Sequence, residues 1–113
     1  MVMIETERKM HMEINQMGIA GTMESSDIMI TIEPIREDRL VINLISSVEK
    51  QFGKQIRTTI EQTLLDLNIS GANISANDKG ALDCVIKARV KAAASRAVGN
   101  NNVSWKGEGD ETA

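Results

Sequence analysis

A chain of 113 residues is long enough to fold as one domain with its own hydrophobic core, without support from a metal or a disulfide. Its formal charge of -3, with one Phe, one Trp and no Tyr, argues against binding of single-stranded nucleic acid, which uses a basic groove and stacking rings. No apolar run approaches the roughly 20 residues of a membrane helix. The single cysteine, Cys84, has no partner for an internal disulfide, as is usual in a reducing cytoplasm.

The two ends of the chain differ from its centre. Residues 1–11 have no hydrophobic period and lack the apolar segment of a signal peptide, so we expect a disordered N-terminal extension and no export. Residues 99–113 are polar and contain glycine apart from Val103 and Trp105, and we expect a disordered tail. Residues 12–98 remain as the single folded domain of a soluble, cytoplasmic protein.

Two strands and a polar turn are predicted first. Residues 19–23 are mildly apolar, and residues 28–32 alternate with the period of two of a half-buried strand. Between them lie Ser25, Ser26 and Asp27, whose side chains favour turns because they hydrogen-bond to nearby backbone groups. We expect a β-hairpin with both serine hydroxyls exposed at its tip.

A third strand follows a surface turn. Pro34 ends the second strand because it has no backbone N–H to donate to a ladder. Residues 40–45 then alternate again, with Leu40, Ile42 and Leu44 on one face. The first three strands are therefore predicted to form an antiparallel meander.

A first helix is predicted from Ser46, because Ser46 and Glu49 have the spacing of a capping box. Gly53 is expected where this helix approaches the sheet closely, since a glycine inside a helix costs about 1 kcal/mol relative to alanine. The opposite edge is basic and is interpreted as a solvated face, with partner docking as the alternative: Lys50, Lys54 and Arg57. The residues of the apolar stripe recur every three or four positions: Val48, Phe52, Ile56, Ile60, Leu64 and Leu67.

Residues 72–77 alternate as a fourth strand, which a crossover helix can place parallel to an earlier strand. After a turn at residues 77–80, a second helix is predicted to end at Gly99. Cys84 is expected in the core beside two of the apolar positions of this helix, which are Leu82, Val85, Ile86, Val90, Ala93 and Ala97. The predicted class is α+β: a two-layer fold with a four-stranded mixed sheet, in the order strand-strand-strand-helix-strand-helix, and both helices on one face.

The sequence predicts no catalytic residue and no metal site. Ser25 has no general base near it, because the only histidine, His11, lies in the expected disordered extension. Glu24 and Asp27 flank Ser25, but carboxylates at a wet turn are expected to remain solvated and ionised, where they would repel phosphate groups. One Cys and one distant His do not make a metal-binding cluster, and no phosphate-binding glycine loop is present.

Three ordered stretches resemble one family. Residues 20–27 (Ala-Gly-Thr-Met-Glu-Ser-Ser-Asp), residues 46–57, and residues 77–89 are similar to motifs of the acyl carrier subunit, or gamma chain, of citrate lyase. The resemblance runs from about residue 12 to residue 97. In that family the serine after the glutamate carries a prosthetic group, and the matching residue here is Ser25.

The resemblance implies a carrier subunit without catalytic activity. It implies that Ser25 bears a covalently attached 2'-(5''-phosphoribosyl)-3'-dephospho-CoA arm, joined through a phosphodiester, whose thiol carries acetyl or citryl as a thioester while citrate is cleaved to acetate and oxaloacetate. The implied partners are the alpha (acyl transferase) and beta (citryl lyase) subunits and a prosthetic-group transferase in the cytoplasm, with neither nucleic acid nor membrane. The alternatives are the carrier subunit of malonate decarboxylase and a regulatory or scaffolding α+β domain with no arm.

Overall fold

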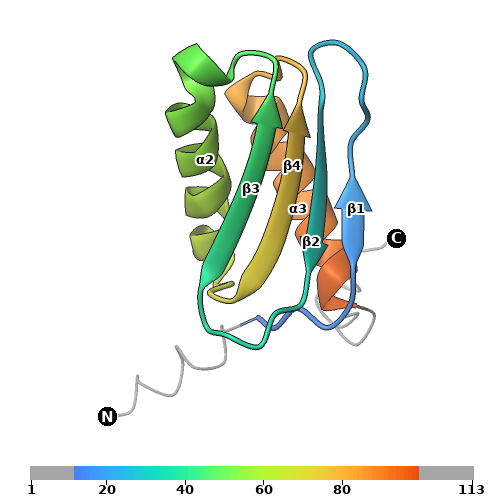
Figure 1. Cartoon of the computed structure of the whole chain (residues 1–113). Helices are drawn as coiled ribbons and strands as arrows, with labels where there is room; N and C mark the ends of the chain where they lie inside the picture. Colours follow the sequence, from blue (N-terminus) through green and yellow to red (C-terminus); the bar gives the residue numbers. More distant parts are fainter. Residues whose placement is uncertain (1–11, 100–113) are drawn as a thin grey trace.

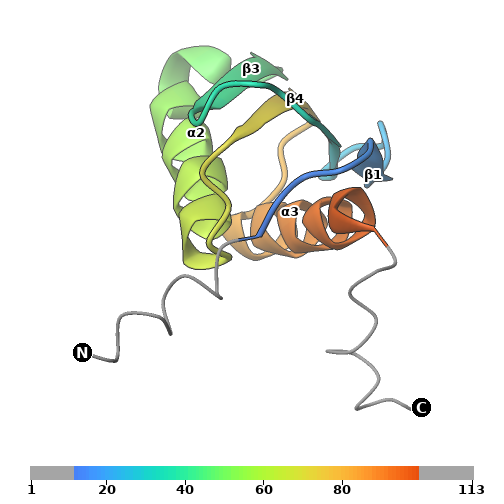
Figure 2. The same ribbon diagram turned by 90° about the horizontal axis from the view of Figure 1, so that it is seen from below.

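A computed structural model describes residues 12–99, and in that range the chain forms one four-stranded sheet covered by two helices. Both helices lie on the same side of the sheet (Figures 1 and 2), and α3 contacts β1 and β2 while α2 contacts β3. The predicted two-layer α+β fold is confirmed. The extension expected at residues 1–11 lies outside the described residues, as does the tail expected at residues 99–113 except for Gly99. The elements are β1 (Gly18–Ala20), β2 (Ile28–Glu33), β3 (Leu40–Ser46), α2 (Glu49–Asp66), β4 (Ala72–Asp78) and α3 (Asp83–Val98).

The order of strands in the sheet is β1-β2-β4-β3. The β1–β2 and β2–β4 pairs are antiparallel and the β3–β4 pair is parallel, so the predicted mixed sheet is confirmed. The predicted three-stranded meander is wrong, because β4 lies between β2 and β3. Helix α2 carries the chain back across the sheet, and the strand that follows it pairs parallel to β3. In that place β4 forms ladders on both of its edges.

The core lies between the sheet and the helices. Alternate residues of the central strands point into it, and the register places Ile32 opposite Ile74 and Ile30 opposite Ala76. Each of these isoleucines is fully buried, and full burial of one such side chain stabilises the fold by about 1.5–3 kcal/mol. Small side chains on α3 let β1 approach closely: a Cβ on Gly18 would lie 2.1 Å from the Ala93 carbonyl oxygen.

The start of α2 differs from the prediction. The helix begins at Glu49 with Val48 at the N-cap, so the predicted capping box from Ser46 is wrong. Ser46 is the last residue of β3, and its hydroxyl donates to Asp78 Oδ2 at 2.8 Å and accepts from the Val48 N–H at 3.1 Å. The hydroxyl therefore links the end of β4 to the N-cap residue of α2 and does not itself cap the helix.

Three predicted core positions lie at the surface. Phe52 is 46 % exposed and Leu82 is 69 % exposed, and Cys84 is also exposed. All three lie at or beside the first turns of the helices, at the end where Figure 1 shows α2 extending beyond the tip of β3. The apolar stripes become buried only farther along, at Ile56 and Ile86.

Candidate functional site

The segment of residues 21–27 connects β1 to β2 and is called the Ser25 turn below. The Asp27 N–H donates to the Glu24 carbonyl at 3.1 Å, which closes a tight turn with Ser25 and Ser26 at its centre. Ser26 has a φ of 66°, in the left-handed region. Both serines are exposed, as predicted. Among residues 12–99 the structure gives the Ser25 hydroxyl no hydrogen bond, so this oxygen faces solvent unpaired.

Gly21 sets the conformation at the start of the turn. Its φ is 99°, and a Cβ at this position would lie 1.8 Å from the Ile28 carbonyl oxygen. Only glycine fits a backbone with this φ and this close approach. Gly21 therefore fixes the direction in which the backbone leaves β1.

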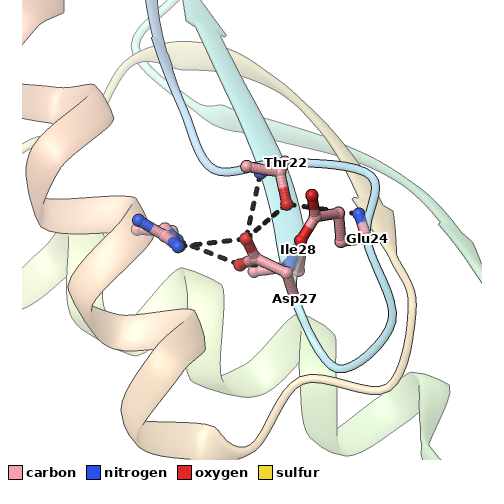
Figure 3. A network of polar contacts seen from close by, with 5 residues as sticks. Thr22, Glu24, Asp27 and Ile28 are labelled. Atoms are coloured by element: carbon pink, nitrogen blue, oxygen red, sulfur yellow. Dashed lines mark hydrogen bonds and ion pairs between the residues drawn. The ribbon is translucent and has the colours of Figure 1, made fainter.

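Asp27 ties the two ends of the turn together. Its carboxylate accepts hydrogen bonds from the Thr22 hydroxyl at 2.7 Å and the Thr22 N–H at 3.2 Å, as Figure 3 shows, and from the Ile28 N–H at 2.7 Å. The Thr22 hydroxyl oxygen also accepts from the Glu24 N–H at 3.2 Å. These bonds link residues on both sides of Ser25 without using Ser25 itself.

Arg89 of α3 completes this network. Its Nε donates to Asp27 Oδ1 and its Nη2 donates to Asp27 Oδ2, both at 3.0 Å. The hydrogen bonds from Arg89, and then those from Thr22 and Ile28, hold the pKa of Asp27 well below its ordinary range. The same contact raises the pKa of Arg89. Asp27 is buried and paired, so the predicted solvated carboxylate is wrong here, whereas Glu24 is exposed as predicted.

The Ser25 turn is also joined to the connection between β4 and α3. The Ser26 N–H donates to the Lys79 carbonyl at 2.8 Å, and the Lys79 N–H donates to the Asp27 carbonyl at 2.9 Å. That connection is itself organised by Asp78, which is 1 % exposed and accepts from the N–H groups of Gly80 and Ala81, each at 3.0 Å. The two turns therefore form one hydrogen-bonded unit.

Side chains from all three stretches singled out in the sequence meet at this end of the sheet. The first stretch contributes Asp27, the second Ser46, and the third both Asp78 and Arg89. The contacts of Asp27 with Arg89 and of Ser46 with Asp78 were not predicted, because their partners lie 62 and 32 residues apart. The sequence contained only a weak signal for the contact with Arg89. Arg89 follows Ile86, an apolar position of the helix, by three residues, so both lie on the side of the helix that faces the sheet.

An apolar groove lies beside the two joined turns. It has a volume of about 440 Å³ and runs between the first turns of α2 and α3, with Phe52, Ile56 and Leu82 among its walls. Gln55 and Asp83 face each other at its rim, where Gln55 Nε2 lies 3.3 Å from Asp83 Oδ2. Gly80 lines the groove and directly follows Lys79, which is bonded to the Ser25 turn.

Outside the Ser25 turn, the described part of the chain has an exposed thiol, Cys84, but no metal-binding cluster. Within residues 12–99, no three His, Cys, Asp or Glu side chains are grouped so that they could hold a metal ion. None of the helices in that range is long and apolar enough to cross a membrane. The exposed hydroxyl on a well-fixed turn is the feature that distinguishes this surface.

Comparisons with known proteins define the class. Residues 15–97 match the model of a family of acyl carrier proteins described as the malonate decarboxylase delta subunit. The fold also matches a chain in the crystal structure of a Pseudomonas malonate decarboxylase hetero-tetramer in complex with malonate, with a TM-score of 0.62 and 21 % identity over 77 % of this chain and 92 % of that one. The chain is thus an acyl carrier protein, a carrier subunit that is not itself a catalyst.

Sequence relatives define the family more narrowly. The citrate lyase acyl carrier proteins of Streptococcus pyogenes serotype M5 (strain Manfredo) and serotype M1 are each 53 % identical to this chain over 95 residues, which is 84 % of this chain and 93 % of theirs. The chain belongs to the citrate lyase acyl carrier protein family.

Proposed function

We propose that Ser25 is the point at which this carrier is loaded with its prosthetic group, and that the group is a phosphoribosyl-dephospho-CoA arm. Three features support the choice of residue. The Ser25 hydroxyl is exposed, it has no hydrogen-bond partner among the described residues, and the turn around it is fixed by Asp27. A covalent arm needs an accessible oxygen on a rigid base, and this turn provides both.

The residues around Ser25 fit a phosphodiester at this oxygen. Arg89 pairs with Asp27, so of the two carboxylates that flank the serines only Glu24 is left exposed. The repulsion between the turn and the phosphates of the arm is therefore smaller than the sequence suggested. The exposed Glu24 carboxylate would still repel these phosphates and so keep the arm extended into solvent. Once bound, the arm would supply a terminal thiol that holds acetyl or citryl as a thioester.

The attachment itself would be a substitution at phosphorus. The Ser25 oxygen would form a bond to the phosphorus of a phosphoanhydride of the arm, the P–O bond to the leaving phosphate group would break, and the serine proton would pass to the transferase or to solvent. Among the described residues no His lies near Ser25 to accept that proton. The separate transferase would therefore supply the base, and this chain would supply the positioned hydroxyl.

The proposed partners are a prosthetic-group transferase and the alpha and beta subunits of a cytoplasmic citrate lyase, between which the arm would move the acyl group. Tethering makes each encounter intramolecular and raises the effective concentration of the acyl group, provided that the arm reaches both sites. The sequence identity to citrate lyase carriers carries this assignment. A carrier of malonate decarboxylase is the second candidate, supported by the family model and by the shared fold.

Intact-mass measurement after incubation with the transferase and an activated arm tests the proposal. The wild-type chain should gain the mass of one arm, and Ser25→Ala should gain none while its free energy of unfolding changes by no more than about 0.5 kcal/mol. Ser26→Gly is the matched control, because glycine accepts the left-handed φ of Ser26 without strain. It should still gain the arm.

Two outcomes would contradict the proposal: a Ser25→Ala chain that still gains the arm, or a wild-type chain that supports citrate cleavage without it. Exchange of acetyl for citryl, compared with exchange for malonyl, on the loaded protein separates the two candidate complexes.

A further inference from the structure

We propose that Arg89 is a positioning residue for loading of the carrier: acting through Asp27, it holds the Ser25 turn in the conformation that the transferase accepts. This inference rests on the proposed attachment at Ser25 and adds a residue to it that lies 64 positions away along the chain.

The pair has a geometry that fixes direction. Nε and Nη2 of Arg89 each contact a different oxygen of Asp27 at 3.0 Å, so the planar guanidinium allows the carboxylate one orientation. The Asp27 side chain is only 13 % exposed and that of Arg89 is 39 % exposed. Arg89 lies between Ile86 and Val90, both fully buried, so the guanidinium extends from a helix that is anchored in the core.

Asp27 passes this orientation to both ends of the turn. Oδ2 accepts from the N–H and hydroxyl of Thr22, at the beginning of the turn, and Oδ1 accepts from the N–H of Ile28, just after it. Ser25 lies between these two anchored ends. Its position therefore depends on the carboxylate, and the orientation of the carboxylate depends on Arg89.

Partly exposed ion pairs contribute little to stability. The main consequence of this pair is thus the placement of the Ser25 oxygen, and a reacting group displaced by about 1 Å can lose about 100-fold in rate. Loss of Arg89 should consequently slow the attachment reaction much more than it lowers the thermal stability of the chain.

The experiment measures the rate of arm attachment by intact mass, with the full-length chain, the transferase and the activated arm, well below the melting temperature of each variant. Arg89→Gln should lower kcat/KM for attachment by about 10- to 100-fold. Arg89→Lys should give an intermediate value, because it keeps the charge and loses the two-pronged contact. The control is Lys87→Gln, which removes a positive charge from an exposed position on the same helix and should leave the rate unchanged.

Two further measurements separate positioning from direct contact with the transferase. Asp27→Asn should also slow attachment, and the double variant with Arg89→Gln should be no slower than the slower single variant, because both changes remove one interaction. Amide hydrogen exchange at Thr22 and Ile28 should be faster in Arg89→Gln than in the wild type.

Additive losses in the double variant would mean that the transferase reads Arg89 directly and would overturn the inference. An unchanged attachment rate in Arg89→Gln, with or without faster exchange, would also overturn it while leaving attachment at Ser25 intact. A wild-type chain that gains no arm, or a Ser25→Ala chain that gains one, would instead overturn the proposed function together with this inference.

Discussion

The two joined turns at the Ser25 end of the sheet are built in similar ways and differ in one respect. In each, a buried aspartate accepts hydrogen bonds from nearby backbone N–H groups: Asp27 in the Ser25 turn and Asp78 before Gly80 and Ala81. Asp27 is also paired with a cation, Arg89, whereas the donors to Asp78 are backbone amides and the hydroxyl of Ser46. The turn that presents the exposed Ser25 is therefore the one whose aspartate is also bound by an arginine side chain from α3.

This difference suggests a division of roles. Asp78 joins β3, β4 and the start of α3, so its loss should affect folding. The Asp27–Arg89 pair lies nearer the surface and fixes a loop, so its loss should affect presentation of Ser25. The following experiments compare the two turns in order of decreasing expected effect.

Replacement of Asp78 by alanine is expected to have the largest effect on stability. It removes the acceptor for the Ser46 hydroxyl and for two backbone N–H groups, at a position that is 1 % exposed. These three donors are only partly buried, so each one left without an acceptor should cost about 1 kcal/mol, at the low end of the range for unsatisfied groups. We therefore expect a loss of about 3 kcal/mol in urea unfolding. Glu61→Ala, at an exposed position of α2, should change stability by no more than about 0.5 kcal/mol. Equal effects of the two substitutions would refute the structural role of Asp78.

The next largest effects on stability are expected from alanine substitutions at Gly21 and Gly80, which should cost different amounts in the two turns. Both glycines have φ near 90–100°, but a Cβ at Gly21 would meet the Ile28 carbonyl at 1.8 Å, whereas one at Gly80 meets nothing within 4 Å. Gly80→Ala should therefore cost only backbone strain, about 1 kcal/mol, and Gly21→Ala should cost about 1 kcal/mol more because of the contact with Ile28. Thermal unfolding measures both. A cost at Gly80 that matched the cost at Gly21 would show that strain, and not the contact with Ile28, controls the Ser25 turn.

Acid should loosen the Ser25 turn in a defined pH window. Pairing with Arg89 lowers the pKa of Asp27 in the folded chain. The stabilisation that the pair gives to the folded turn is therefore fully present at pH values above the ordinary pKa of an aspartate, about 3.9. Its contribution is lost as the pH falls below that value toward the folded-state pKa. The amide signal of Thr22 in NMR spectra should hence be constant from pH 7 to about 5 and shift only in stronger acid. In Arg89→Gln the shift should begin at higher pH, and an identical titration in both proteins would contradict the assignment of the pair.

The smallest effect is expected just beyond the Asp78 turn, at Cys84. The thiol is exposed on the first turn of α3, so Cys84→Ser should change the free energy of unfolding by no more than about 0.5 kcal/mol. The native protein should react with a thiol reagent about as fast as the unfolded chain does. Strong protection in the native state would show that this end of α3 is covered.

The sequence predicted most of the fold because its strongest signals are local. Alternation identified β2 and β4, the three- and four-residue spacing identified both helices, and Gly99 marked the end of α3. The exposed serines were also predicted, since turn-forming residues act on their own backbone. The errors in placing single residues in the core or at a cap lie near the helix starts, where Ser46, Phe52 and Cys84 fit a local pattern but have other surroundings in the fold.

By itself, the sequence determined the class of fold, the two-layer arrangement and the accessible position of Ser25, because hydrophobic period and turn chemistry depend on residues close together in the chain. Only the tertiary structure decided that β4 enters between β2 and β3, and that Asp27 is bound by Arg89 instead of by water. Strand order and ion pairing are set by contacts between distant segments, and those contacts depend on which segments share the core. The sequence predicts that the Asp27 carboxylate, two residues after Ser25, is solvated. In the fold it is buried because α3 brings the Arg89 guanidinium to it from 62 residues away.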